Sequence, residues 1–179
     1  RASFLRTIWH EMSRLHSHLL WLGLLADAFA FDSLFMHCWK LRESVLDLLE
    51  KTTGGRVIFS VCVPGGVKKD IDDETLKEIV DTLNGIKAEL TDVFMEDVSV
   101  KNRLCGVGVI TKEQAIELGA VGPVARGSGV VQDMRLAGEG VYDRLGFEPV
   151  VEEGGDCYAR CIVRIREVFQ SIELIEKAV

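Results

Sequence analysis

Apolar residues recur at every third or fourth position along the N-terminal part of the chain, the spacing of one helix face. This pattern predicts a long helix over Phe4–Phe31, amphipathic in its first half and apolar on nearly every side in its second. An all-round apolar helix is typical of one enclosed in a larger body. A second helix is predicted from Leu34 to Thr53, with Asp32-Ser33 as its N-cap and Gly54-Gly55 as its end. Because the connection is so short, we expect an antiparallel helical hairpin.

The next elements follow from composition and periodicity together. Residues Arg56–Val63 are rich in β-branched side chains and predict a strand that stops at Pro64. A stripe of apolar residues predicts a third helix that begins at Asp72, where the acidic start suits the helix dipole. Tyr158–Val179 shows the same periodicity and predicts the last helix.

Between the third and the last helix the pattern is weaker. Thr111 and Gln114 form a capping box, which predicts a short helix that ends at Gly119. Residues 122–156 are predicted to be loop-rich, with room for short strands. The expected fold is therefore mainly α with a small β element, a long-helix bundle in a single domain over residues 1–179.

Charge and hydropathy narrow the possible partners. The formal net charge is −7 and the isoelectric point is near 5.2, which argues against a nucleic-acid partner. Hydrophobic residues make up 47% of the chain, so we expect some apolar surface to meet partner chains, or to cause self-association of the chain. The longest apolar run, Leu19–Phe31, is interrupted by Asp27 and is shorter than the ~20 residues that cross a bilayer.

The spacing of the cysteines and histidines along the sequence does not match that of metal ligands. The five cysteines include no CxxC pair, which indicates a reducing compartment and buried thiols rather than disulfides. Cys157 and Cys161 lie one helical turn apart, but no nearby histidine or second cysteine pair completes a metal site. His10, His16 and His37 have no partners at ligand spacing, so no metal ligand is assigned in this chain.

Glu11, Arg14 and His18 share one face of the first predicted helix. A carboxylate and a guanidinium at this spacing can pair across one turn. Two interpretations stay open: a structural ion pair that orients the helix, or a network that surrounds a redox centre or proton path.

Asp27 lies among Leu24, Leu25, Ala26, Ala28 and Phe29. If it is buried there, its pKa is raised and it can carry a proton near neutral pH. The alternative is that it points out of the bundle, toward solvent or a partner chain.

The last helix carries a polar stripe that suggests a ladder of salt bridges. A glycine-rich stretch, residues 122–135, supplies further charges that we expect to pair with this stripe. Specifically, Arg126 or Asp133 is predicted to contact Asp156, Arg160 or Arg164. The stripe comprises Asp156, Arg160, Arg164, Glu167 and Ser171, and the charged residues of the stretch are Arg126, Asp133 and Arg135. No catalytic triad, P-loop or dinucleotide-binding motif is present, so no catalytic residue is assigned.

Several stretches in fixed order resemble one family over essentially the whole chain. They are similar to the large subunit of NiFe hydrogenases and to its relative, the 49 kDa subunit of respiratory complex I. Each stretch alone is weakly specific, whereas the ordered set is strong. The stretches are EMSRLHSHLLWLG (11–23), FDSLFM (31–36), TGGR (53–56), PGGVKKD (64–70), GVGVI (106–110), GPVARGSGVVQDMR (122–135) and GDCYARCIVRIREVFQSIELI (155–175).

Within that family the resemblance favours the membrane-bound, energy-converting hydrogenases of the formate hydrogenlyase and CO-induced types. Complex I subunits carry an aspartate where this chain has Ala28, and a cluster-bonded histidine where it has Ile58. The implied activity is proton reduction or hydrogen oxidation coupled to ion movement across a membrane. The open alternatives are a complex I subunit that works with NADH and quinone, and a relative that has lost its metal and serves as a scaffold.

The resemblance also implies cofactors and partners. Family members hold nickel and iron with two cysteine pairs, neither of which matches these residues, so we expect a central piece of a longer subunit that is inactive alone. An iron–sulfur cluster is expected in a small partner subunit, and further contacts with membrane-arm subunits. The implied location is cytoplasmic, peripheral on the inner face of the cell membrane. In the family, residues 122–135 form a loop that supports the region around the buried centre.

Overall fold

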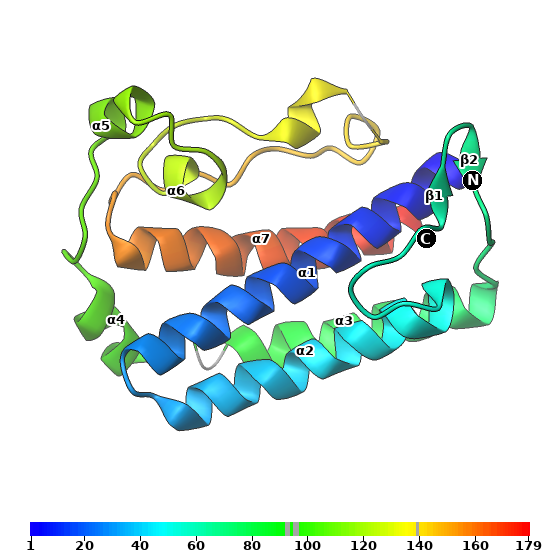
Figure 1. The fold of residues 1–179 in the computed structure, drawn as a ribbon, viewed down its shortest axis with the longest axis horizontal. Coiled ribbons are helices and arrows are strands. Elements are labelled where there is room, and N and C mark those ends of the chain that lie inside the picture. Colours follow the sequence, from blue (N-terminus) through cyan, green and yellow to red (C-terminus); the bar gives the residue numbers. More distant parts are fainter. Residues whose placement is uncertain (92–93, 95–96, 139) are drawn as a thin grey trace.

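Four long helices form a bundle in the computed structural model, which describes residues 1–91, 94, 97–138 and 140–179. Helix α1 (Ala2–Ala28) and helix α2 (Asp32–Thr53) form an antiparallel hairpin, as predicted (Figure 1). Helix α3 (Asp73–Leu90) packs on α2 and α7, and helix α7 (Cys157–Ala178) packs on α1. The mainly helical fold with a small β element is thereby confirmed.

The hairpin is fixed by burial and by its two ends. Trp9 of α1 is fully buried, and its indole Nε1 donates a hydrogen bond to Thr52 Oγ1 of α2 at 3.1 Å. Helix α2 ends at Gly54, whose φ of 83° suits a residue without a side chain. The predicted N-cap of α2 is wrong by one position: Phe31 is the cap residue, and Asp32 lies in the first turn.

The predicted strand Arg56–Val63 is largely wrong. Only strand β1 (Cys62–Val63) forms, and it pairs with strand β2 (Gly66–Val67) in a short antiparallel hairpin near the start of α1 (Figure 1). Ile58 is 91% exposed, and although Phe59 and Val61 pack on the core, residues 56–61 pair with no neighbouring strand. Strand propensity reflects packing on a sheet, and in this run no such packing exists.

Helices α3 and α7 begin within one residue of their predicted starts. Asp72 caps α3 by accepting a hydrogen bond from the Thr75 amide at 2.8 Å. Asp156 caps α7 in the same way, with the Ala159 amide at 2.7 Å. The buried faces of all four helices join into one apolar core, and a smaller cluster around Tyr142 and Phe147 lies beside it.

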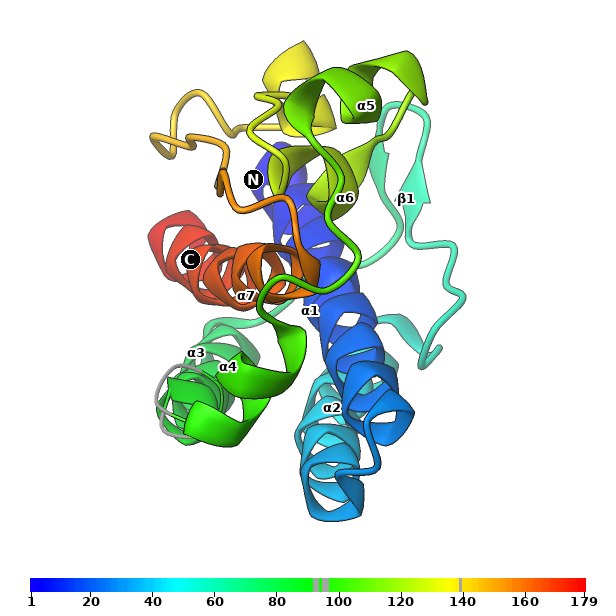
Figure 2. The same ribbon diagram turned by 90° about the vertical axis from the view of Figure 1, so that its left-hand side faces the viewer.

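Short helices and loops cover α7 on its far side from α3 (Figure 2). Helix α4 (Val98–Leu104) was not predicted, whereas helix α5 (Lys112–Glu117) has the predicted Thr111 capping box. The described part of 122–156 contains no strand. It holds helix α6 (Gly122–Arg126) and the 3-10 helix η2 (Met134–Ala137) instead. Across the described residues, no helix combines the length and hydropathy required to cross a bilayer.

Candidate functional site

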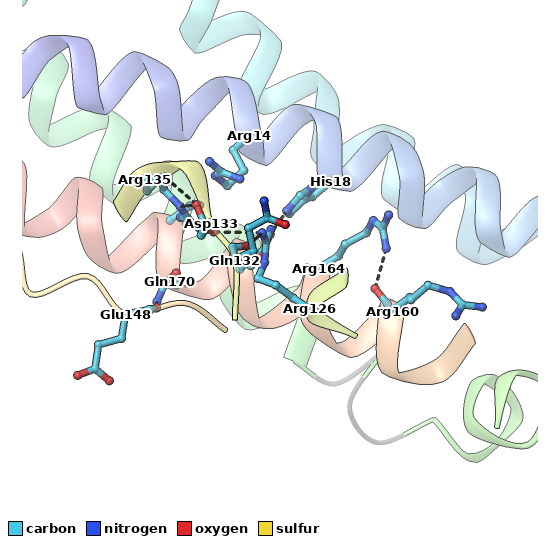
Figure 3. A network of polar contacts seen from close by, with 12 residues as sticks. Arg14, His18, Arg126, Gln132, Asp133, Arg135, Glu148, Arg160, Arg164 and Gln170 are labelled. Carbon is cyan, nitrogen blue, oxygen red and sulfur yellow. Dashed lines mark hydrogen bonds and ion pairs between the residues drawn. The ribbon is translucent and has the colours of Figure 1, made fainter. Parts of the chain in front are cut away.

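A network of buried charges lies where α1, α7 and the segment 122–137 meet (Figure 3). The bundle faces that surround it are apolar, so each charge depends on partners within the network. Its members come from four parts of the chain. They are Glu11, Arg14 and His18 of α1; Arg126, Asp133 and Arg135 of the segment 122–137; Tyr142 of the turn that follows; and Arg164, Glu167 and Ser171 of α7.

Glu11 is fully buried, and four side chains surround its carboxylate. Tyr142 and Ser171 each donate a hydroxyl hydrogen bond to it at 2.6 Å. Arg135 approaches it at 3.3 Å and Arg14 at 3.4 Å. Burial, together with the charge of Glu11, raises the pKa of Tyr142, so the phenol stays protonated and acts as a donor.

Glu167 is the second fully buried carboxylate. Arg126 Nε donates to its Oε1 at 2.6 Å, and His18 Nε2 lies 2.6 Å from its Oε2. Burial alone would raise the pKa of Glu167, but the hydrogen bond from His18 and the charges of Arg126 and Arg135 outweigh it and lower the pKa. An ionised carboxylate only accepts, so the proton of this bond resides on His18 Nε2.

His18 is neutral near pH 7. Burial lowers its pKa by more than the hydrogen bond to Glu167 raises it, and the charges of Arg14 and Arg164 lower it further. Because His18 also lines an open pocket, it is placed between solvent and the buried Glu167.

Asp133 accepts hydrogen bonds from Arg135 within the segment 122–137 and lies near Arg126. Arg135 donates to its two oxygens at 3.1 and 2.9 Å, and the Arg135 amide donates at 3.0 Å. Burial alone would raise the pKa of Asp133, but these bonds and the nearby arginine charges lower it. Arg126 adds a hydrogen bond to the Gln132 carbonyl at 2.8 Å and a 3.4 Å contact to Asp133.

Arg164 has no carboxylate partner at hydrogen-bond distance among the described residues. Its guanidinium lies 3.7 Å from the ring centroid of Trp21 and donates to the Arg160 carbonyl at 2.8 Å. Burial lowers its pKa to about 10, and the charges of Arg160 and Arg126 also lower it. Four guanidinium groups thus face three carboxylates, which gives the network a formal net charge of +1 while His18 is neutral.

Three predicted candidates lie outside the network. Asp27 is exposed at the end of α1, which is the outward orientation left open by the sequence. Asp156 serves as the cap of α7 and also accepts from the Gly106 amide at 2.7 Å. Arg160 donates to two backbone carbonyls, those of Gly155 at 2.7 Å and Gly108 at 2.8 Å.

The predicted pairing of the loop with α7 needs a correction. Arg126 and Asp133 are buried as expected, but neither contacts the side chain of Asp156, Arg160 or Arg164 within the described residues. The contact on α7 is Glu167, which the polar stripe contained but the pairing did not use. Tyr142 was missed, since a tyrosine in a loop carries no periodic signal. The sequence clue to the role of Glu167 is its position directly before the apolar Val168, on the side of the helix that faces the core.

An open pocket of about 450 Å³ lies over the α1 side of the network. Its walls come from α1, η2 and the turn that holds Tyr142. The lining residues are His10, Ser13, Arg14, Ser17, His18, Met134, Arg135 and Tyr142.

The described residues do not fit a nickel–iron centre. Metal ligation needs thiolates, whereas burial raises the pKa of Cys38 and of Cys161 to about 12. In the described part of the chain, no three His, Cys, Asp or Glu side chains gather in a metal-binding arrangement. No metal ligand is therefore assigned among the described residues.

Comparison with known proteins identifies relatives along nearly the whole chain. A family model described as the 49 Kd subunit of respiratory-chain NADH dehydrogenase matches residues 29–179. The alpha subunit of the membrane-bound hydrogenase of Pyrococcus furiosus is 40% identical over 99% of this chain and 44% of its own length. One subunit of the F(420)H(2) dehydrogenase of Methanosarcina mazei is 39% identical over 99% of this chain and 48% of its own length.

Two further similarities complete the comparison. One subunit of the NADH-quinone oxidoreductase of Bacteroides thetaiotaomicron is 36% identical over 100% of this chain and 34% of its own length. A chain of the membrane-bound sulfane sulfur reductase, an archaeal respiratory membrane complex, superposes with a TM-score of 0.89 at 34% identity. The present chain covers 49% of the length of that reductase chain. It spans less than half the length of each of these relatives.

Proposed function

Since the chain belongs to the family of the respiratory-chain NADH dehydrogenase 49 kDa subunit, we propose that it forms part of the large subunit of an energy-converting NiFe hydrogenase. The supporting observation is the 40% identity to the alpha subunit of a membrane-bound hydrogenase over 99% of the chain. The whole enzyme would interconvert protons and hydrogen and couple this reaction to ion movement across a membrane. Its nickel and iron ligands would belong to parts of the subunit outside these residues.

Ala28 and Ile58 support the hydrogenase branch over quinone reduction. By the resemblance, the quinone-reducing subunits carry an ionisable side chain at each position. Here both are apolar, and neither can exchange a proton or donate a hydrogen bond from its side chain. Both residues are exposed on the surface of the described chain, where another subunit of the complex can reach them.

Within that enzyme, the buried network would position the loop 122–137 against the bundle. Arg126 and Arg135 each join this loop to a fully buried carboxylate on a long helix. Charge-assisted hydrogen bonds of this kind are strong and directional. His18 would be the member that exchanges protons, because its Nε2 donates a hydrogen bond to Glu167 and its ring borders the open pocket.

The partners follow from the relatives. The relatives are subunits of membrane-bound or respiratory complexes, so we propose membrane-arm subunits as partners, and the family resemblance adds an iron–sulfur small subunit. The expected location is the inner face of the cell membrane, reached through these subunits. Self-association through the apolar half of α1 stays a prediction, with Leu24 exposed on that half.

A second candidate is a quinone-reducing subunit of the complex I type. The observation that favours it is the match of residues 29–179 to the 49 Kd family, together with the NADH-quinone oxidoreductase relative at 36% identity. A metal-free scaffold is the third possibility.

Elemental analysis tests the choice. The full-length subunit, purified with its small-subunit partner, is expected to contain about one nickel per large subunit, the content of a single bound centre. It should evolve hydrogen from reduced methyl viologen. Iron without nickel, together with quinone reduction, would replace the hydrogenase assignment by the second candidate. The absence of both nickel and quinone reduction would indicate a scaffold.

A further inference from the structure

The pocket over the network is lined by hydrogen-bond donors and by no carboxylate. Two serines, two histidines, one tyrosine and two arginines form most of its wall. The network beneath it carries a net charge of +1. A concave, positively charged wall that is rich in donors favours an anion.

Among the four arginines of the network, Arg14 has the longest distance to its nearest polar partner within the described residues. Its Nε atom is buried and has no hydrogen-bond partner among the described residues, and its nearest carboxylate, Glu11, lies at 3.4 Å. Arg126, Arg135 and Arg164 each donate at least one hydrogen bond of 2.9 Å or shorter. The Nε atom faces Glu11 and is closed to solvent, but the Arg14 side chain is 25% exposed and lines the pocket, so a ligand there can reach the outer part of its guanidinium.

Glu11 cannot satisfy Arg14 more fully in this arrangement. Its two oxygens already accept short hydrogen bonds from Tyr142 and Ser171, and Arg135 occupies a further position. Moving Glu11 toward Arg14 would lengthen these bonds. The missing acceptor therefore has to come from outside the network.

We propose that the pocket receives a carboxylate side chain from a docked polypeptide, and that this carboxylate pairs with Arg14. The planar guanidinium fork matches a carboxylate in two parallel hydrogen bonds. One added negative charge would also bring the network to neutrality.

The rim of the pocket indicates a polypeptide rather than a free ion. Met134, which lines the pocket, is 78% exposed, and Leu136 of the same short helix η2 is also exposed. Apolar side chains at the mouth of a charged pocket gain stability when a protein surface covers them. This step rests on the proposed function: the similar chain of known structure is about twice as long as this one, so the full-length subunit has further polypeptide that can supply the carboxylate.

Arginine-specific modification with phenylglyoxal, read by peptide mass spectrometry, tests the proposal. In the isolated chain, Arg14 should react, and sodium acetate should slow the reaction with half-protection at roughly 1–100 mM, the range of a weak single ion pair. Acetamide with sodium chloride at equal ionic strength should protect much less. Arg144, which is exposed and stacked on Phe4, is the control whose rate should not respond to acetate.

The assembled complex of the full-length subunit distinguishes the source of the carboxylate. Protection of Arg14 there without acetate supports a docked polypeptide. If Arg14 in the complex reacts and is protected only by added acetate, the occupant is a soluble anion and the polypeptide is ruled out. Equal reaction rates with acetate and with acetamide in the isolated chain would overturn the site itself. These results do not depend on nickel content, so they are separate from the test of the hydrogenase assignment.

Discussion

Replacing Glu167 with glutamine is the sharpest test of the buried network. The amide keeps the size of the side chain but removes its negative charge. Arg126 would then have Asp133, at 3.4 Å, as its remaining carboxylate contact within the network. The formal charge of the network would rise from +1 to +2 in a buried setting.

The expected loss is large because one partner of a buried ion pair is removed. Such changes cost about 3–5 kcal/mol of the free energy of unfolding, mostly because the remaining charge is left uncompensated. For a chain of 179 residues this corresponds to a fall of about 10 °C in Tm. Urea denaturation followed by circular dichroism measures the loss directly.

Glu173→Gln is the matched control on the same helix. Glu173 is exposed and pairs with Lys87 at 2.9 Å, so the change should cost less than about 0.5 kcal/mol. The double variant R126Q/E167Q should be more stable than the sum of the two single losses predicts, because both charges leave together. If E167Q stays within about 1 kcal/mol of the unaltered chain, the network does not contribute as described.

Two further predictions concern the backbone and pH. Gly155→Ala should destabilise by roughly 2–4 kcal/mol, because φ is +65° and the new Cβ would lie 2.5 Å from the Ile110 carbonyl oxygen. Gly146→Ala, with φ of +70° and open space around it, should cost only about 1 kcal/mol in the same denaturation assay. For His18, the folded pKa lies below the unfolded value of about 6.5, so the unfolded chain takes up a proton that the native chain does not. The free energy of unfolding should therefore fall as pH drops from 7 toward 5, and H18Q should show a shallower fall. An equal slope in both proteins would show that His18 is not buried in its neutral form.

The long helices could be predicted because each buries a single stripe of apolar residues. For α7, periodicity placed the helix at Tyr158–Val179, within one residue of the observed Cys157–Ala178. The run Arg56–Val63 failed for a tertiary reason: β-branched residues indicate a strand, but most of this run has no partner strand to pair with.

The candidate site could be predicted in part. The helical spacing of Glu11, Arg14 and His18 placed them correctly on one face, and the expected pairing of the segment 122–135 with the polar stripe is found between Arg126 and Glu167. Their partners could not be found from spacing, because the bond from Ser171 to Glu11 joins residues that are 160 positions apart. Of the two orientations left open for Asp27, the structure shows the exposed one; apolar neighbours in sequence do not determine which side of a helix end faces the core.

The long sequence separation of these bonds has a consequence for the order of folding. Glu11 and His18 lie near the start of the chain, while their partners Ser171 and Glu167 lie near its end. During synthesis the α1–α2 hairpin emerges before α7, and the side chains of Glu11 and His18 must stay hydrated until α7 has been made. The bundle can therefore close only after α7 has left the ribosome. Contacts between residues so far apart in sequence make this closure slow. A nascent chain without α7 would present the apolar face of α1 to solvent, and such a chain is a natural client for a chaperone.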